Sequence, residues 1–494
     1  MKKNMFLSLI ISFSAYIAYI GSNAQLHTFI EISQGFGFFV LGMTLILISV
    51  ATILQRFNIE SYVLFTPIII MMLIRRIWSM PYDALYDLGL GYLHYEILLF
   101  FYIITFLILI IFSLKFKQKL LNIMLIFAIT GAGVYSLEAY EKLKLSYANY
   151  KYVQTDEFKN KNQKFIDSNK NLDGVIKNYF NVYHILYDSY PGKDRMKEII
   201  NYDQTGFYNK LNNRGFKTYE PAYSNGAQTF TTLSSMFNMK WKKFNEYPKY
   251  NYIGINKVFA KFIANDYKIV CDYPCYNNWG TFKWNDNVLS ANSDLYFPML
   301  NNYLHYYLGR IFLMNVDKFD KENKMFFKQI KQSDINKNYF HYIHYKSGFL
   351  LERDTHEKIR KKLSKINKQL ILLIDLIGSR DKNAIIILSS DHGSRGKWAG
   401  FKNSSNAHAK FSILQAVKFP PACKRFNNIP ILTSVNYYKY VFACLNGKNQ
   451  PKNLQPNESI KSDFDIDKIW HTDSKDHYIF IRDNKIITPP ELIK

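Results

Sequence analysis

Cysteine is scarce in this sequence, with four residues in a chain of 494. That scarcity excludes a small scaffold held together by disulfides, and no Cys/His spacing is typical of a zinc finger. The chain also has no internal repeat and no low-complexity tract. Apolar residues make up 48% and aromatic residues 17% of the chain, which excludes disorder and collagen-like fibres. Its length predicts more than one domain.

Long hydrophobic runs are confined to the first quarter of the chain. A transmembrane helix needs roughly 20 residues, with a range of about 17–25. Four of the five runs reach that range and the third is short; they are Met5–Ser22, Phe36–Leu54, Ile59–Ile74, Glu96–Leu114 and Leu120–Leu137. The series continues behind the first run, so the first run is not a cleaved signal peptide. We therefore predict a five-helix transmembrane domain over residues 1–137.

The distribution of positive charge predicts how this domain is oriented. With the N-terminus inside, the outer loops carry only Arg75 and Arg76, whereas the inner segments carry Lys2, Lys3, Arg56, Lys115, Lys117 and Lys119. Five spans then place everything after residue 138 outside the cytoplasm, which in a bacterium with an outer membrane is the periplasmic side of the inner membrane. The alternative is four spans, without Ile59–Ile74, which would leave it in the cytoplasm.

The chain has only 39 acidic residues against 63 lysines and arginines, and most of the net charge of +24 lies after residue 149. A basic domain outside a membrane faces anionic lipid or glycan head groups, so nucleic acid is not expected as a partner. A general richness in Lys, Asn, Tyr and Ile explains the same charge without any partner.

Residues 178–494 have the pattern of an α/β domain with a mostly parallel central sheet. Residues 138–177 are polar and predict a membrane-proximal helical linker. Two apolar strands are expected at Asn181–Tyr187 and Ala384–Ser389, and a helix at His356–Ile377. Ligands gather beyond the carboxyl ends of such strands.

Asp188 follows the first of these strands, and Asp391 and His392 follow the second. If the two strands are neighbours, the three side chains converge on one divalent cation. Aspartate and histidine ligands favour zinc or manganese. The alternative is that each aspartate only stabilises a turn.

Hydroxyl side chains cluster in Asn225–Asn238, a glycine-containing loop followed by a helix expected from about Thr232. A hydroxyl at a helix N-terminus beside a cation is activated as a nucleophile. The spacing alone does not choose among its candidates, which are Thr229, Thr231, Thr232, Ser234 and Ser235.

Five blocks in order carry a resemblance to a known family. They are NVYHILYDSYPG, GFKTYEPAYSNGAQTFTTLSSMFNM, NYFHYIHYKSGF, IIILSSDHGSRG and ILTSVNYYKYVFACLNG. Their succession resembles the sulfatase-like branch of the alkaline phosphatase superfamily. With five spans in front, it is similar to the membrane-anchored bacterial phosphoethanolamine transferases and lipoteichoic acid synthases.

The resemblance implies a role for each candidate residue. Thr229 corresponds to the nucleophile, and the implied metal ligands are Asp188, Thr229, Asp391 and His392. His408 and His341 are implied as catalytic residues, and the substrate-binding set is His344, Lys346, Arg395 and Thr232. Lys346 stands where relatives often have a histidine, which leaves the acid/base assignment open. No cysteine or serine has the context for conversion to formylglycine, which argues against sulfate-ester hydrolysis by that route.

The implied reaction is transfer of phosphoethanolamine or phosphoglycerol from a membrane phospholipid to an envelope glycan or glycolipid. It would be metal-dependent and pass through a phospho-threonine. Two alternatives stay open: a hydrolase of phosphoric or sulfuric esters, and a non-catalytic protein of polysaccharide assembly.

The four cysteines allow two bridges. Cys271 and Cys275 are spaced to close a small loop, and Cys423 and Cys444 are either paired or simply buried.

Overall fold

A computed structural model describes most of residues 155–455, with gaps at 227–228, 241–255, 272–287, 291–317, 335–336, 346–355, 394–410, 430 and 432. It also describes strands within 458–486 and scattered stretches within 6–152. The chain divides into two units, Met1–Thr155 with Asp294–Val316, and Asp156–Ser293 with Asp317–Lys494.

The first unit contains helix α3 (Gly42–Arg56), which overlaps the second predicted span. A small buried cluster draws on four of the five predicted runs, through Leu7, Ile11, Leu47, Ala51, Phe65 and Leu121. Within the described residues, no helix is both long enough and apolar enough to cross a membrane. The five spans lie only partly within these residues and stay a prediction.

A seven-stranded sheet forms the centre of the second unit, in the order β2-β7-β6-β1-β5-β3-β4. Its strands are β1 (Val182–Tyr187), β2 (Lys217–Thr218), β3 (Lys268–Cys271), β4 (Val288–Ser290), β5 (Tyr339–Tyr345), β6 (Ile385–Ser389) and β7 (Gln415–Lys418). Strands β6, β1, β5, β3 and β4 run parallel to one another. Strand β7 pairs antiparallel with β6, and β2 pairs antiparallel with β7. The prediction of a mostly parallel sheet in an α/β domain is confirmed.

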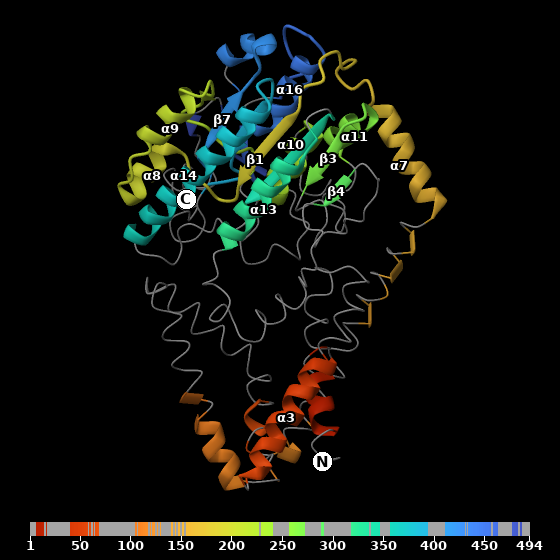
Figure 1. Ribbon diagram of the computed structural model, residues 1–494, viewed down its shortest axis with the longest axis vertical. Coiled ribbons are helices and arrows are strands. Elements are labelled where there is room, and N and C mark those ends of the chain that lie inside the picture. Colours follow the sequence, from red (N-terminus) through yellow and green to blue (C-terminus); the bar gives the residue numbers. More distant parts are fainter. Residues whose placement is uncertain are drawn as a thin grey trace. The chain divides into compact units, whose positions relative to one another are not determined.

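Helices cover both faces of this sheet (Figure 1). One face packs on α8 (Lys193–Ile200), α9 (Thr205–Asn212), α13 (Lys318–Gln332) and α14 (His356–Arg380). The other packs on α10 (Thr229–Asn238), α11 (Lys257–Ala264), η5 (Pro421–Asn428) and α16 (Tyr437–Leu445). Successive strand side chains point to opposite faces. Accordingly, Tyr183, Ile185 and Tyr187 of β1 join the first core, whereas Val182 and Leu186 join the second.

The remaining elements lie around this core. Helix α7 (Asp156–Asn169) falls within the predicted linker and packs against α11. The short helix η6 (Ser434–Asn436) precedes α16. Strands β8 (Glu458–Ser462), β9 (His477–Arg482) and β10 (Lys485–Ile486) form a small antiparallel sheet.

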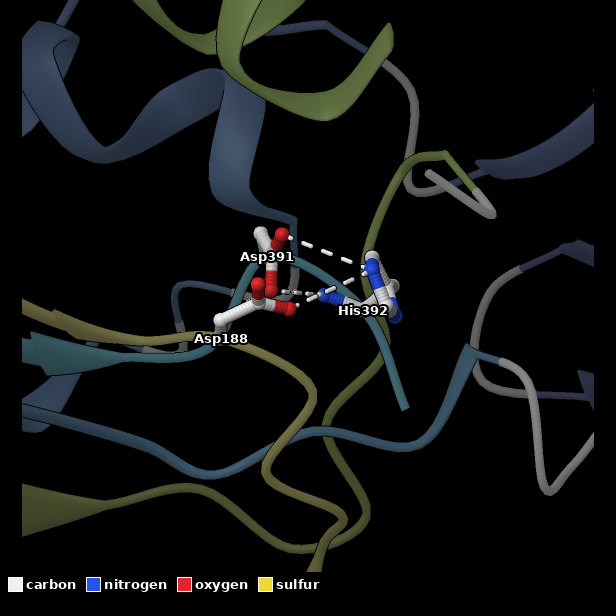
Figure 2. A group of neighbouring side chains, drawn as sticks. All are labelled: Asp188, Asp391 and His392. Carbon is white, nitrogen blue, oxygen red and sulfur yellow. Dashed lines mark hydrogen bonds and ion pairs between the residues drawn. The ribbon is translucent and has the colours of Figure 1, made fainter. Parts of the chain in front are cut away.

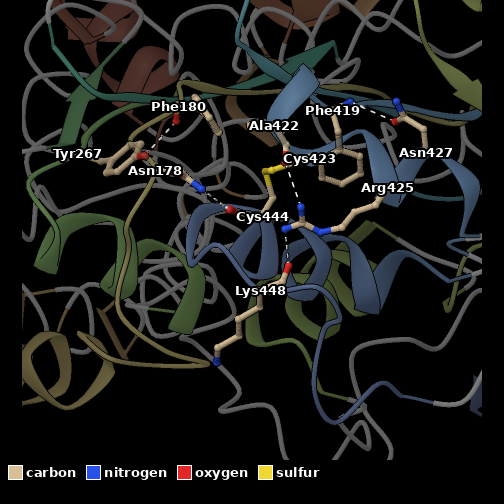
Figure 3. Close-up of a disulfide and its surroundings, with 10 residues drawn as sticks. All are labelled: Asn178, Phe180, Tyr267, Phe419, Ala422, Cys423, Arg425, Asn427, Cys444 and Lys448. Atoms are coloured by element: carbon tan, nitrogen blue, oxygen red, sulfur yellow. Dashed lines mark hydrogen bonds between the residues drawn. A yellow bond between two sulfur atoms is a disulfide. The ribbon is translucent and has the colours of Figure 1, made fainter.

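A disulfide between Cys423 and Cys444 joins η5 to α16, with Cα atoms 5.5 Å apart (Figure 3). Beside it, the Asn178 side chain donates a hydrogen bond to the Cys444 carbonyl at 3.0 Å. Of the two possibilities for this pair, bridged or simply buried, the structure shows the bridge. Cys271 is disulfide-bonded as well.

Candidate metal centre

The carboxyl ends of β1 and β6 bring three predicted side chains together. The two strands are parallel neighbours, with Val182 opposite Ile385, so that their ends meet at one edge of the sheet. Asp188 directly follows β1, and Asp391 and His392 follow β6. One ligand atom from each lies within 4.8 Å of the other two (Figure 2).

His392 is oriented by its own backbone neighbour. Its Nδ1–H donates to the Gly393 carbonyl at 2.9 Å, which leaves the lone pair on Nε2. That nitrogen lies 3.5 Å from Asp391 Oδ2 and 3.7 Å from Asp188 Oδ1. A histidine that donates one ring N–H to a carbonyl and presents the other nitrogen has the usual arrangement of a metal ligand.

The three residues have the chemistry and spacing that a divalent cation requires. Zinc binds oxygen and nitrogen ligands at about 2.0–2.2 Å in a tetrahedron, so that neighbouring ligands lie about 3.4 Å apart. The separations of 3.5 and 3.7 Å from His392 Nε2 match that spacing. The side chains of Asp391 and His392 are fully buried, and that of Asp188 is 20% exposed. A buried carboxylate is costly unless charge or hydrogen bonds compensate it, and a cation would supply that compensation.

A hydroxyl stands beside these three ligands. Thr229 is the first residue of α10, three residues earlier than the residue pattern predicted, and its Oγ1 lies 3.5 Å from His392 Nε2. It is half-buried, so that a ligand can reach it. Its place at the helix N-terminus favours negative charge on the oxygen.

Two other hydroxyls nearby are engaged in the fold. Thr232 is buried and donates to the Gly226 carbonyl at 3.1 Å. Ser189 lies 3.4 Å from His392 but is buried and donates to Asp188 Oδ1 at 2.7 Å. Of the three hydroxyls, Thr229 alone is partly exposed.

The structure does not bring His341 to this cluster. His341 stacks on Tyr183 at 4.8 Å and lies 3.4 Å from the Ser333 hydroxyl, on the face covered by α13 and α14. The Asp188 N–H donates to the carbonyl of Tyr345, at the end of β5. His341 lies four residues before Tyr345, or about 13 Å back along the strand. Burial lowers the pKa of His341 to about 3. Its expected catalytic role therefore has no geometric basis.

His344 lies on the opposite face of β5, in register with Leu186 of β1. Helix α10 packs on this face. His344 lies one residue before the end of β5. Its substrate-binding role stays a prediction. The other predicted residues of the site, Lys346, Arg395 and His408, lie outside the described residues.

Sequence reasoning missed two residues of this region. His184 of β1 is buried, with Nδ1 2.7 Å from the Tyr438 hydroxyl and Nε2 2.8 Å from the Ser389 hydroxyl. Burial lowers its pKa to about 3. Ser189 contacts all three members of the cluster, and its position directly after Asp188 was the available signal.

The chain is therefore an α/β protein with a candidate metal centre at the carboxyl edge of its sheet. No family model and no curated relative matches it. Solved structures similar to it include the integral membrane lipooligosaccharide phosphoethanolamine transferase A of Neisseria meningitidis. That likeness has 13% identity, covers 89% of this chain and 96% of the other, and has a TM-score of 0.34.

Two further similar structures come from other bacteria. The C-terminal periplasmic domain of EcEptC from Escherichia coli, in complex with Zn, has 10% identity over 59% of this chain and 91% of the other, with a TM-score of 0.36. A protein in the alkaline phosphatase superfamily from Vibrio parahaemolyticus has 12% identity over 62% and 82%, with a TM-score of 0.37. Their low identities leave the reaction to be argued from the site itself.

Proposed function

We propose that this chain is a metal-dependent enzyme of the bacterial cell envelope that transfers a phospho-head group through Thr229. The observation that carries the proposal is the placement of the Thr229 hydroxyl. It lies at the start of α10, half-buried, with Oγ1 3.5 Å from Nε2 of His392 in the Asp188–Asp391–His392 cluster. A partly exposed hydroxyl beside a ligand set is the arrangement of a nucleophile.

Asp188, Asp391 and His392 would hold a zinc or manganese ion, which when bound stabilises the ionised hydroxyl and offsets charge on phosphoryl oxygens. A bond forms from Thr229 Oγ1 to phosphorus, and the Thr229 proton passes overall to the leaving diacylglycerol oxygen. The bond from phosphorus to the diacylglycerol oxygen breaks, and that oxygen gains a proton. The N-terminus of α10 stabilises the negative charge that develops on Thr229 Oγ1 as its proton leaves.

The second half of the reaction returns Thr229 to its starting state. A hydroxyl of an envelope glycan or glycolipid bonds to phosphorus, the phosphorus–Thr229 bond breaks, and Oγ1 regains a proton. The acceptor hydroxyl needs a base, for which we propose His408. Lys346 and Arg395 would neutralise phosphoryl oxygens.

We propose a phospholipid as donor, carrying phosphoethanolamine or phosphoglycerol, because apolar runs are concentrated before residue 138. A membrane-embedded first unit would keep the site close to lipid donors and to lipid-linked acceptors. The partial exposure of Thr229 and Asp188 favours one second candidate. Water that reaches the intermediate would make the same residues a hydrolase.

The test is the intact mass of the full chain in detergent after incubation with bacterial phospholipids and manganese. We expect an adduct on the wild type and on Thr231→Ala, and none on Thr229→Ala. Thr231 is the matched control because it is a threonine on the same helical turn. An adduct on folded Thr229→Ala would contradict the assignment. Diacylglycerol release without any adduct would favour the hydrolase.

A further inference from the structure

Ser189 touches every member of the Asp188–Asp391–His392 cluster. Its backbone N–H donates to Asp391 Oδ1 at 3.0 Å, and its hydroxyl donates to Asp188 Oδ1 at 2.7 Å. The same hydroxyl oxygen lies 3.4 Å from both ring nitrogens of His392. The residue is completely buried. One side chain therefore restricts the carboxylates and the imidazole together.

The backbone of Ser189 is left-handed, with φ of 59°. A residue with a Cβ adopts this conformation only where its surroundings hold it. The surroundings here are the loop that follows β6. The Ser189 N–H bonds to Asp391, and the next N–H, that of Tyr190, donates to Ser390 Oγ at 2.8 Å. Two consecutive N–H groups thus attach the end of β1 to the end of β6.

These bonds determine which carboxylate oxygens are directed to the centre. Asp391 Oδ1 accepts both the Ser189 N–H and the His392 N–H, each at 3.0 Å. Its Oδ2 is the oxygen 3.5 Å from His392 Nε2. In Asp188, the oxygen held by the Ser189 hydroxyl is the one that faces His392 Nε2, at 3.7 Å.

We infer that Ser189 is the positioning residue of the metal centre, and that its hydroxyl holds the ligands in place before a cation binds. The inference rests on the metal-dependent function proposed above. Ser189 is not itself a nucleophile, because it is buried and its proton is engaged by Asp188. Partners of this kind orient ligands, and their loss typically weakens metal affinity by about 10- to 100-fold.

The experiment compares zinc affinity in Ser189→Ala and Ser189→Gly, by competition with a chromophoric chelator on the full chain in detergent. Both variants lack the hydroxyl and keep the backbone N–H. Glycine adopts the left-handed backbone freely, whereas alanine keeps the strain that serine already has. We expect both to lose zinc affinity by about 10- to 100-fold. Because glycine relieves the backbone, Ser189→Gly should also unfold at a higher temperature than Ser189→Ala.

Asn201 supplies the matched control. It is an exposed residue after α8 that is also left-handed, with φ of 48°. Asn201→Ala should lower the unfolding temperature and leave zinc affinity unchanged. This variant separates backbone strain from an effect on the metal centre.

Three results would overturn the inference. Unchanged zinc affinity in both Ser189 variants would show that the hydroxyl does not position the ligands. Loss in Ser189→Ala with full affinity in Ser189→Gly would assign the effect to the backbone. A wild-type chain that binds neither zinc nor manganese would overturn the metal centre as well. The first two results leave the proposed function standing, because wild-type adduct formation on Thr229 is unaffected by them.

Discussion

His184 and His341 lie on adjacent strands but on opposite faces of the sheet, and each is completely buried. His184 is held by the hydroxyls of Tyr438 and Ser389, and His341 stacks on Tyr183. Burial lowers the pKa of both to about 3, from an ordinary value of 6.5. At neutral pH both rings are therefore uncharged in the folded chain.

This depression of the pKa couples folding to pH. Between pH 6.5 and 3, the unfolded chain binds protons that these two histidines exclude when folded, so that stability falls as the pH falls. At pH 5 each histidine lowers the free energy of unfolding by about 2 kcal/mol relative to pH 7. His341→Phe keeps a ring on Tyr183. Between pH 7 and pH 5 its free energy of unfolding should fall by about 2 kcal/mol less than that of the wild type.

Urea titrations at pH 7 and pH 5, followed by tryptophan fluorescence, measure this difference. The control is His356→Phe, at an exposed position at the start of α14, which should keep the wild-type dependence on pH. A His341→Phe chain with the same pH dependence as the wild type would show that folding does not lower the pKa of His341.

The residues of the site were predictable to different degrees. Asp188, Asp391 and His392 lie within three residues of the ends of apolar strands, so their convergence followed from strand order. His341 and His344 are three residues apart on one strand and therefore point to opposite faces. The sequence does not say which face carries the site, because that depends on where α10 packs. Ser189 was missed because its backbone conformation arises from bonds to the distant β6 loop.

At the scale of elements, the approach of α10 to the sheet edge depends on the loop before it. The carbonyl of Gly226 accepts hydroxyl hydrogen bonds from Ser224 at 2.7 Å and Thr232 at 3.1 Å. A Cβ on Gly226 would lie 2.5 Å from Thr231 Oγ1 and 3.1 Å from the backbone nitrogen of Thr232. The loop therefore has room only for glycine.

We expect Gly226→Ala to displace the first turn of α10 and with it Thr229. A displacement near 1 Å costs about 100-fold in rate, so adduct formation at Thr229 should slow by that order. Zinc affinity should fall much less than the adduct rate, because Asp188, Asp391 and His392 lie outside α10 and stay in place. Adduct rate and zinc affinity, measured on the same preparation, separate the two effects.

Gly378 in α14 provides the control for this substitution, because nothing lies within 4 Å of its added Cβ. Gly378→Ala should leave the adduct rate unchanged and stabilise the chain by about 0.5–1 kcal/mol. Normal adduct formation in Gly226→Ala would show that the loop does not position Thr229.

Long apolar or amphipathic elements were predicted well, and short ones less well. Strands β1 and β6 begin one residue after their predicted starts, and α14 extends three residues beyond its predicted end. Strand β2 has only two residues and forms by antiparallel pairing with β7. Such a strand depends on its partner rather than on its own residues, and no local pattern indicates it.

At the scale of the whole molecule, two independent features bear on where the second unit resides. The charge bias between the predicted loops places it outside the cytoplasm if five runs cross the membrane. The Cys423–Cys444 disulfide lies in that same unit (Figure 3). Disulfides persist in oxidising compartments such as the periplasm. The disulfide favours five spans over four, because five spans with the N-terminus inside place this unit outside the cytoplasm.

Large apolar side chains are exposed in the described part of the N-terminal unit. Phe6, Leu45 and Ile111 are each more than half exposed, at 63%, 64% and 63%. The choice between four and five spans depends on Ile59–Ile74, the shortest run.

Reporter fusions after residue 155 decide between these topologies. At this position, a reporter enzyme that works only in the periplasm should be active. A fluorescent protein that matures only in the cytoplasm should stay dark. Deleting residues 59–74 should reverse both signals, because removal of one span changes the parity of crossings. The reverse pattern in the fusion that keeps residues 59–74 would place the second unit in the cytoplasm. It would then contradict both the five-span topology and the proposed envelope acceptor, since that acceptor lies on the other side of the membrane.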